Sequence, residues 1–125
     1  MQLTPTFHII RNVYTPKKMR KYTFYEVVQH CFDIVCETWQ VTPTLLKSKS
    51  RKREYTVPRQ VLAYLVFHYT DFSLQKVGRE IGGRDHSTII HAKQIVDELS
   101  MWDKVFKSKV DDCERYINSM HKRVK

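Results

Sequence analysis

The sequence predicts an all-α domain of about six helices that contains a helix-turn-helix. Three observations support this fold class. Apolar residues recur at helical spacing through most of the chain after residue 23. Helix-capping residues precede several of these stretches. Two adjacent glycines, Gly82 and Gly83, separate two of the expected helices, and glycine readily adopts the positive φ that ends a helix and redirects the chain.

The first expected helix begins at Thr23, where Thr23-Phe24-Tyr25-Glu26 forms a capping-box pattern. Its apolar stripe comprises Phe24, Val28, Cys31, Phe32 and Val35. A second, short helix is expected to begin after Thr42, which would cap it. Pro43 would occupy the first helical position, where the missing N–H of proline costs nothing. A basic loop over 47–54 follows, and Pro58 is expected to open a third helix over about 58–69. Its buried stripe comprises Val61, Leu62, Leu65, Val66 and Tyr69.

The helix-turn-helix is expected over residues 74–99. Ser73 would cap a helix over 74–81, and Asp85 would cap a helix over 86 to about 99. The inward face of the second helix comprises Ile89, Ala92, Val96 and Leu99. Its first turn carries polar side chains, and the second helix of this motif characteristically enters a DNA major groove.

A second capping-box pattern, Ser100-Met101-Trp102-Asp103, predicts a last helix near 102–118. Its inward face comprises Val105, Phe106, Val110, Cys113 and Ile117. The expected organisation is therefore a basic N-terminal arm over 1–22, a helical domain over 23–120 and a basic tail over 121–125. A short strand is one option for the arm.

Charge is unevenly distributed along the 125 residues. Twenty-two Lys and Arg against thirteen Asp and Glu give a formal net charge of +9. Residues 11–22 hold five bases and no acid, and residues 47–59 hold six bases against Glu54 alone. A basic surface suits a polyanion, because each phosphate that is neutralised releases counterions. Basic character alone is equally compatible with a role in solubility.

Several other classes of function lack the residues that they need. His86 and His91 are five residues apart, whereas helical zinc pairs use a spacing of four, so no metal site is expected. Gly78 and Gly83 have the spacing of a phosphate-binding loop, but Arg84 and Asp85 follow where Lys and Ser or Thr are required. We therefore expect neither an enzyme nor a bound cofactor.

Two further features of the sequence indicate the cellular compartment of the protein. The three cysteines, Cys31, Cys36 and Cys113, are odd in number and show no CxxC spacing, as is usual in a reducing cytosol. No apolar stretch approaches the roughly 18 residues of a membrane span, and no signal-peptide layout appears. A cytoplasmic protein without a membrane partner is expected.

The run Gly82-Gly83-Arg84-Asp85-His86-Ser87-Thr88-Ile89-Ile90-His91-Ala92 resembles the signature of the C-terminal DNA-binding domain of DnaA, the bacterial chromosomal replication initiator. The resemblance extends back to the basic run 48–53 and covers about residues 23–118. It implies a Trp-repressor-like helix-turn-helix that stands alone, without the ATPase module of the initiator. The chain departs from the pattern of this family at three positions. Ser87 stands where the family usually has Thr, Gln75 where it usually has Pro, and Phe67 where it often has a basic or polar residue.

The resemblance also implies roles for individual residues. The residues expected to contact DNA are Arg51, Arg59, Gln60, Leu74, Arg84, Asp85, His86, Ser87, Thr88 and Ala92. Of these, residues 85–88 would face bases in the major groove, and Ala92 would touch a thymine methyl. Arg51 would enter the minor groove, where arginine suits narrow A·T-rich stretches. Arg59 and Gln60, placed at a helix N-terminus, and the backbone around Leu74 would contact phosphates.

The function predicted on these grounds is sequence-specific binding of double-stranded DNA. DnaA-box-like sites are expected, in a bacterial or phage setting, for replication initiation, its regulation or transcription. Replication or regulatory proteins are further candidate partners, and the sequence indicates no particular oligomeric state. Two alternatives are a protein-interaction adaptor that keeps the fold without binding specific DNA, and an RNA-binding protein. The latter is disfavoured because the chain lacks an aromatic-rich sheet for base stacking.

Overall fold

The computed structural model describes residues 22–121, which contain six helices and no strand. The helices are α2 (Phe24–Trp39), α3 (Pro43–Lys47), α4 (Arg53–Tyr69), α5 (Leu74–Glu80), α6 (His86–Trp102) and α7 (Lys104–His121). The expected all-α class and helix-turn-helix are confirmed. Most of the arm, with its optional strand, and most of the C-terminal tail lie outside the described residues.

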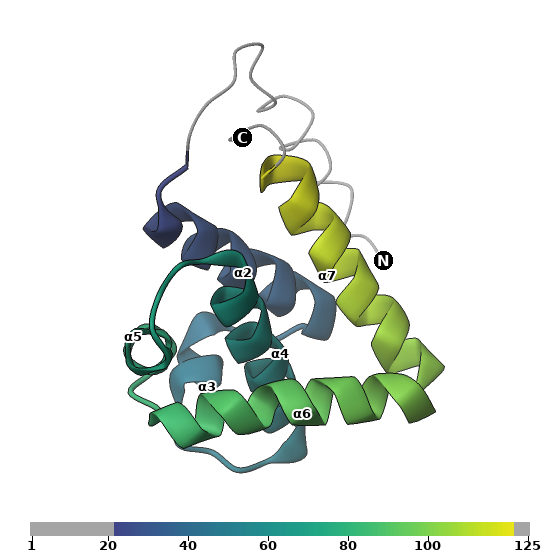
Figure 1. Cartoon of the computed structure of the whole chain (residues 1–125). Coiled ribbons are helices and arrows are strands. Elements are labelled where there is room, and N and C mark those ends of the chain that lie inside the picture. The colour runs from purple at the N-terminus through teal and green to yellow at the C-terminus, as the bar shows by residue number, and fades with distance from the viewer. Residues whose placement is uncertain (1–21, 122–125) are drawn as a thin grey trace.

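Helix α4 is central to the domain (Figure 1). It packs against α2, α3, α5 and α6, while α7 packs against α2 and the far end of α6. Val61, Leu62, Leu65 and Val66 of α4 are fully buried, as the helical periodicity predicts. The start of α6 lies beside α5, and the loop between α3 and α4 passes beneath α6 in this view. The packing therefore brings two sequence-distant polar segments to one edge of the molecule.

The capping residues predicted from the sequence are observed at four helix starts, those of α2, α3, α5 and α6. Thr23 and Glu26 form a reciprocal capping box, with N–H···O distances of 2.8 and 3.1 Å. The hydroxyl of Thr42 accepts from the N–H of Leu45, and that of Ser73 accepts from the N–H of Lys76. These caps satisfy backbone donors that the first helical turn leaves unpaired.

Two expected helix boundaries are wrong. Helix α4 begins at Arg53, with Pro58 inside it, because the N–H groups of Tyr55 and Thr56 already bond to the carbonyl of Lys52. Helix α6 continues to Trp102 instead of ending near 99. The carboxylate of Asp103 caps α7 by accepting from the N–H of Phe106 at 3.0 Å, so the expected Ser100 cap is replaced.

The buried faces follow the predicted stripes with two exceptions. Phe106, Val110, Cys113 and Ile117 of α7 are buried, but Val105 is 67% exposed, because the later start of α7 places it at the turn. Phe24 is also largely exposed, at the first turn of α2. Tyr22 belongs to the domain and not to the arm, since its ring contacts that of His30 edge-on at 5.0 Å and packs against the core.

Candidate nucleic-acid interface

The turn between α5 and α6 depends on three glycines. Gly82 and Gly83 have φ values of 109° and 78°, a region that L residues rarely adopt. The carbonyl of Gly78 accepts from the N–H groups of both Gly83 and Arg84, at 2.9 and 2.8 Å. This close approach places α6 directly after α5 at a fixed angle.

Asp85 organises the first turn of α6. Its Oδ1 accepts from the N–H of Thr88 at 3.1 Å, from the hydroxyl of Thr88 at 2.9 Å and from that of Ser87 at 3.0 Å. These bonds, those from Thr88 above all, lower the pKa of the Asp85 carboxyl below its ordinary value of 3.8. The carboxylate is therefore ionised at neutral pH, and both hydroxyls donate to it.

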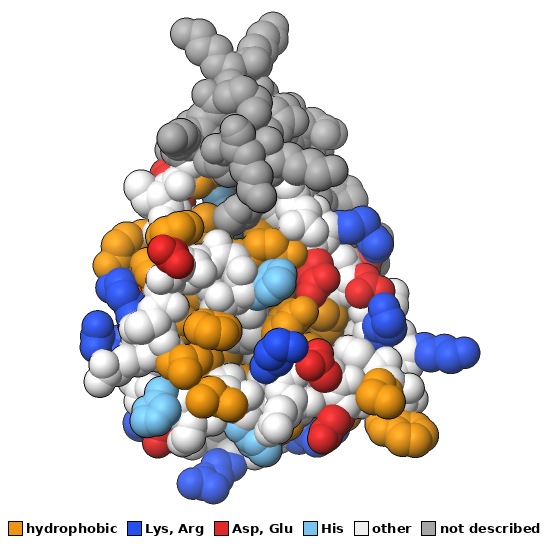
Figure 2. All heavy atoms as spheres, viewed as in Figure 1, with side chains coloured by type: hydrophobic (Ala, Val, Ile, Leu, Met, Phe, Trp, Pro, Cys, Tyr) orange, Lys and Arg blue, Asp and Glu red, His pale blue; other side chains and the backbone are white. Residues whose placement is uncertain are grey.

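His86, Ser87 and Thr88 at the start of α6 are exposed, while Ile89, three residues after His86, is buried. Figure 2 shows histidine, lysine and arginine side chains along the lower edge of the molecule, over the beginning of α6 and the α3–α4 loop. His91 is exposed too, with its Nδ1 3.3 Å from the Oε1 of Gln94. The first turn of α6 thus offers a row of polar side chains to a partner.

The α3–α4 loop carries the second polar segment. Arg51 is exposed, as are its neighbours Lys49 and Lys52 and the first residue of α4, Arg53. Within the described part of the chain, no carboxylate forms an ion pair with any of these four cations. Their positive charge is therefore available to an anionic partner beside α6.

The sequence of this helix-turn-helix and its supporting helices matches a known family. Residues 28–96, more than half of the chain, match the family described as the bacterial dnaA protein helix-turn-helix. The chain belongs to this family. The DnaA helix-turn-helix is a DNA-binding domain, so membership supports DNA binding in general for this chain. The resemblance drawn from the signature run is confirmed.

Two expectations for the DnaA-like interface need correction. Arg59 and Gln60 are the seventh and eighth residues of α4, because the helix begins at Arg53, so neither stands at a helix N-terminus. Arg59 is only 8% exposed and donates to the carbonyls of Leu46 at 2.6 Å and Ser50 at 3.0 Å. Its guanidinium already donates to backbone carbonyls of the protein itself, which disfavours the expected contact with a DNA phosphate.

Ala92 also differs from its expected role. Its side chain is 1% exposed and packs in the core one turn after Ile89. This burial leaves almost no side-chain surface for a thymine methyl, which disfavours the expected contact. Gln60 and Leu74 are half-buried, and Phe67, where the resemblance implies a basic or polar residue, is 40% exposed.

The side chain of Arg84 bonds to the segment that leads from α3 into the α3–α4 loop. Its Nη2 donates to the carbonyl of Ser48 and, at 3.3 Å, to that of Leu46. Sequence reasoning missed this contact and the burial of Arg59. For Arg59 a signal existed, since Leu62, Ala63 and Val66 lie three, four and seven residues further along and form the buried face of the same helix. For Arg84 no local pattern indicates the partner.

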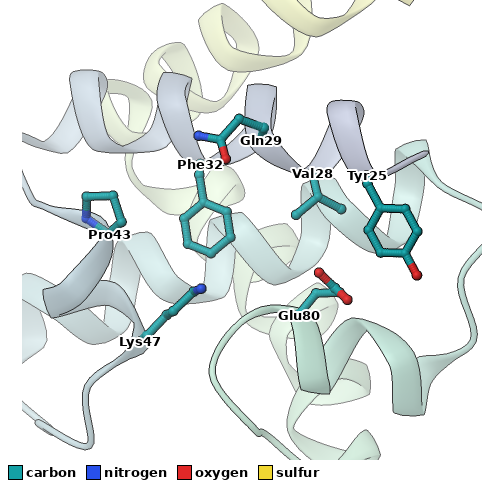
Figure 3. Close-up of a pocket in the computed structure, with 7 residues that line it drawn as sticks. All are labelled: Tyr25, Val28, Gln29, Phe32, Pro43, Lys47 and Glu80. Atoms are coloured by element: carbon teal, nitrogen blue, oxygen red, sulfur yellow. The ribbon is translucent and has the colours of Figure 1, made fainter. Parts of the chain in front are cut away.

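A pocket of about 230 Å³ lies on the other side of the turn, among α2, α3 and α5 (Figure 3). The Nζ of Lys47 lies 5.2 Å from the ring centroid of Phe32, and Glu80 and Tyr25 form the far wall. None of the residues expected to contact DNA lines it. No group of three or more potential metal ligands, and no helix able to span a membrane, occurs among residues 22–121.

Proposed function

We propose that this protein binds double-stranded DNA sequence-specifically, with the start of α6 in the major groove and Arg51 in the adjacent minor groove. The observation that carries the proposal is the exposed first turn of α6, where Asp85 holds Ser87 and Thr88 in place beside the exposed His86. A helix with this arrangement fits the major groove, and its leading residues reach base edges. DnaA-box-like sites are the expected targets.

The hydrogen bonds at Asp85 limit which bases can be read. The hydroxyls of Ser87 and Thr88 both donate their proton to Asp85, so only their lone pairs face outward. In the major groove the matching donors are the amino groups of adenine and cytosine. The second carboxylate oxygen of Asp85 would accept from a cytosine amino group in the same way. We therefore expect base pairs that offer amino groups opposite these residues.

Phosphate contacts would complete the footprint. Lys49, Lys52 and Arg53 surround Arg51 and are exposed. The backbone at Leu74 begins α5, a helix that packs against α6, and is a candidate for a phosphate contact. Such contacts position the protein without reading sequence. A role in replication initiation, in its regulation or in transcription agrees with this footprint.

The experiment that tests the proposal starts with selection of bound duplexes from a random pool. The selected duplex and a scrambled one are then titrated with wild type, His86→Ala and the control His91→Ala. We expect His86→Ala to lose about 1–3 kcal/mol on the selected duplex and little on the scrambled one, as loss of one good base contact does. Equal losses on both duplexes, or no enriched sequence, would refute the assignment.

One observation favours a second candidate, a protein-interaction adaptor. At the corner between α6 and α7, Met101, Trp102 and Val105 are 76%, 84% and 67% exposed. Exposed tryptophan is unusual on a surface that contacts only water and is enriched where proteins meet. If the pool yields no preferred duplex and affinity for any duplex is weak, this candidate replaces the first.

A further inference from the structure

We propose that Arg84 is a positioning residue that ties the minor-groove loop to the recognition helix and so sets the distance between the two DNA-reading segments. The inference rests on the proposed function. Beyond that function, the proposal identifies Arg84 as the residue that holds the α3–α4 loop and the start of α6 at a fixed distance from each other. The contacts of Arg84, of Arg59 and of the glycine turn support it independently.

The first support is the direction of the Arg84 side chain. Its backbone N–H is held by Gly78 at 2.8 Å, directly before the cap of α6. From this fixed point its guanidinium reaches across to the carbonyls of Ser48 and Leu46 in the α3–α4 segment. One residue therefore belongs to the turn through its backbone and to the loop through its side chain.

The second support is a matching clamp from α4. Arg59 donates to the carbonyls of Leu45, Leu46 and Ser50 at 3.3, 2.6 and 3.0 Å. Arg84 and Arg59 thus share the carbonyl of Leu46 as an acceptor. Ser50 directly precedes Arg51, so the clamp ends one residue before the expected minor-groove contact.

The third support is direct packing between turn and loop. A Cβ atom added to Gly82 would lie 3.0 Å from the carbonyl oxygen and 3.1 Å from the Cα of Lys47. These distances are shorter than nearly all real Cβ contacts, so the turn lies against the end of α3 without a gap. The turn therefore provides a fixed base, from which the side chain of Arg84 can hold the loop.

The choice of acceptors also fits a DNA-binding surface. Both guanidinium groups bond to neutral carbonyls, so the clamp orders the loop and leaves two positive charges uncancelled. Burial lowers the pKa of both side chains, and the nearness of Arg84 lowers that of Arg59 further, so the pair costs electrostatic energy. Bound phosphates beside the loop would offset that cost.

The test is a double-mutant cycle with Arg84→Lys, Arg51→Ala and the combined variant. Lysine keeps the charge, but its side chain is one atom shorter than the path to Nη2, the atom that donates to both carbonyls, so its ammonium falls short of them. Each protein is titrated with the selected duplex and with duplexes altered either at the flanking A·T pairs or at the major-groove pairs. Arg115→Lys, on the exposed surface of α7, is the matched control.

We expect Arg84→Lys to weaken binding to the selected duplex about tenfold and to reduce discrimination at the flanking A·T pairs. Discrimination at the major-groove pairs should stay as in wild type. In the Arg51→Ala background, Arg84→Lys should cost less than about threefold, because the group that it positions is gone. If the affinity losses of the two single variants simply multiply in the double variant, the proposal is overturned. A loss of discrimination at the major-groove pairs would overturn it as well.

A measurement on the free protein separates this proposal from the DNA-binding assignment. Amide hydrogen exchange over residues 48–53 should accelerate in Arg84→Lys, while exchange within α6 stays unchanged. If exchange in the loop is unaffected, the clamp is wrong whether or not the chain binds a specific duplex. If exchange accelerates but wild type shows no preferred duplex, the loop contact stands and the DNA-reading role, with the positioning role built on it, is refuted.

Discussion

The carbonyl oxygen of Arg84 occupies the place where a side chain of Gly78 would begin. A Cβ atom at Gly78 would lie 1.9 Å from that oxygen, a distance at which atoms overlap. The same glycine accepts two hydrogen bonds from the turn. Helix α5 can therefore pass this closely under the turn only because residue 78 has no side chain, and the angle between α5 and α6 depends on it.

Substitution of Gly78 should consequently destabilise the domain. Gly78→Ala must push the backbone of Arg84 aside, and overpacking of this kind costs about 1–3 kcal/mol or more, although alanine favours helix. Gly83→Ala is the matched control, because nothing lies within 4 Å of its added Cβ and only the positive φ is strained, at about 1–2 kcal/mol. Urea unfolding should rank Gly78→Ala as the less stable variant. The reverse order would contradict the close approach.

The Asp85 cap predicts a pH dependence of stability. The folded carboxyl has a pKa below 3.8, so its contribution is fully present above that pH and is lost as pH falls through the lower folded value. Asp85→Asn keeps an acceptor but has no charge to titrate. At neutral pH the variant should melt below wild type, and the difference should shrink as pH falls below 3.8. A difference that stays constant in acid would show that the charge contributes nothing.

Removal of residues 1–21 should leave a folded domain. The capping box at Thr23 starts α2 without them, and Tyr22, which packs against the core, is retained. Five bases leave with no acid among residues 11–22, so DNA affinity should fall and its salt slope should become shallower by about 0.9 for each lost phosphate contact.

Circular dichroism and titrations at two salt concentrations check this deletion. A full-length variant in which the five bases are replaced by glutamine is the control for charge alone. An unfolded product would show that the arm completes the core. A normal salt slope in both proteins would show that the arm does not touch phosphates.

The hydrogen bond between Tyr64 of α4 and Glu114 of α7 should contribute to stability. The hydroxyl donates to Oε2 at 2.8 Å in a partly buried position. Tyr64→Phe should cost about 1 kcal/mol in urea unfolding, the usual net value of such a bond. Tyr25→Phe, whose ring is 55% exposed on α2, should change stability little. Equal effects of the two substitutions would contradict a specific link between α4 and α7.

Features that depend on neighbouring residues in the chain could be predicted without the fold. Caps such as Thr23, Ser73 and Asp85 act on backbone groups three residues away, and apolar periodicity identifies the buried face of each helix, so both can be read without the fold. The signature run likewise indicated the family and the exposed first turn of α6. Boundaries were less secure: Pro58 lies inside α4 because bonding to Lys52 starts the helix earlier.

Which of the expected contact residues face outward depends on how the helices pack together. Arg59 and Arg84 are basic, and composition alone places such residues at a DNA surface. In the fold their guanidinium groups meet loop carbonyls that are between 9 and 38 residues away in the chain. A hydrogen bond across that separation leaves no periodic trace in the sequence, because its partner is a backbone carbonyl that every residue possesses. The fold alone therefore separates the exposed side chains at the start of α6 from the two arginines that bond to the protein backbone.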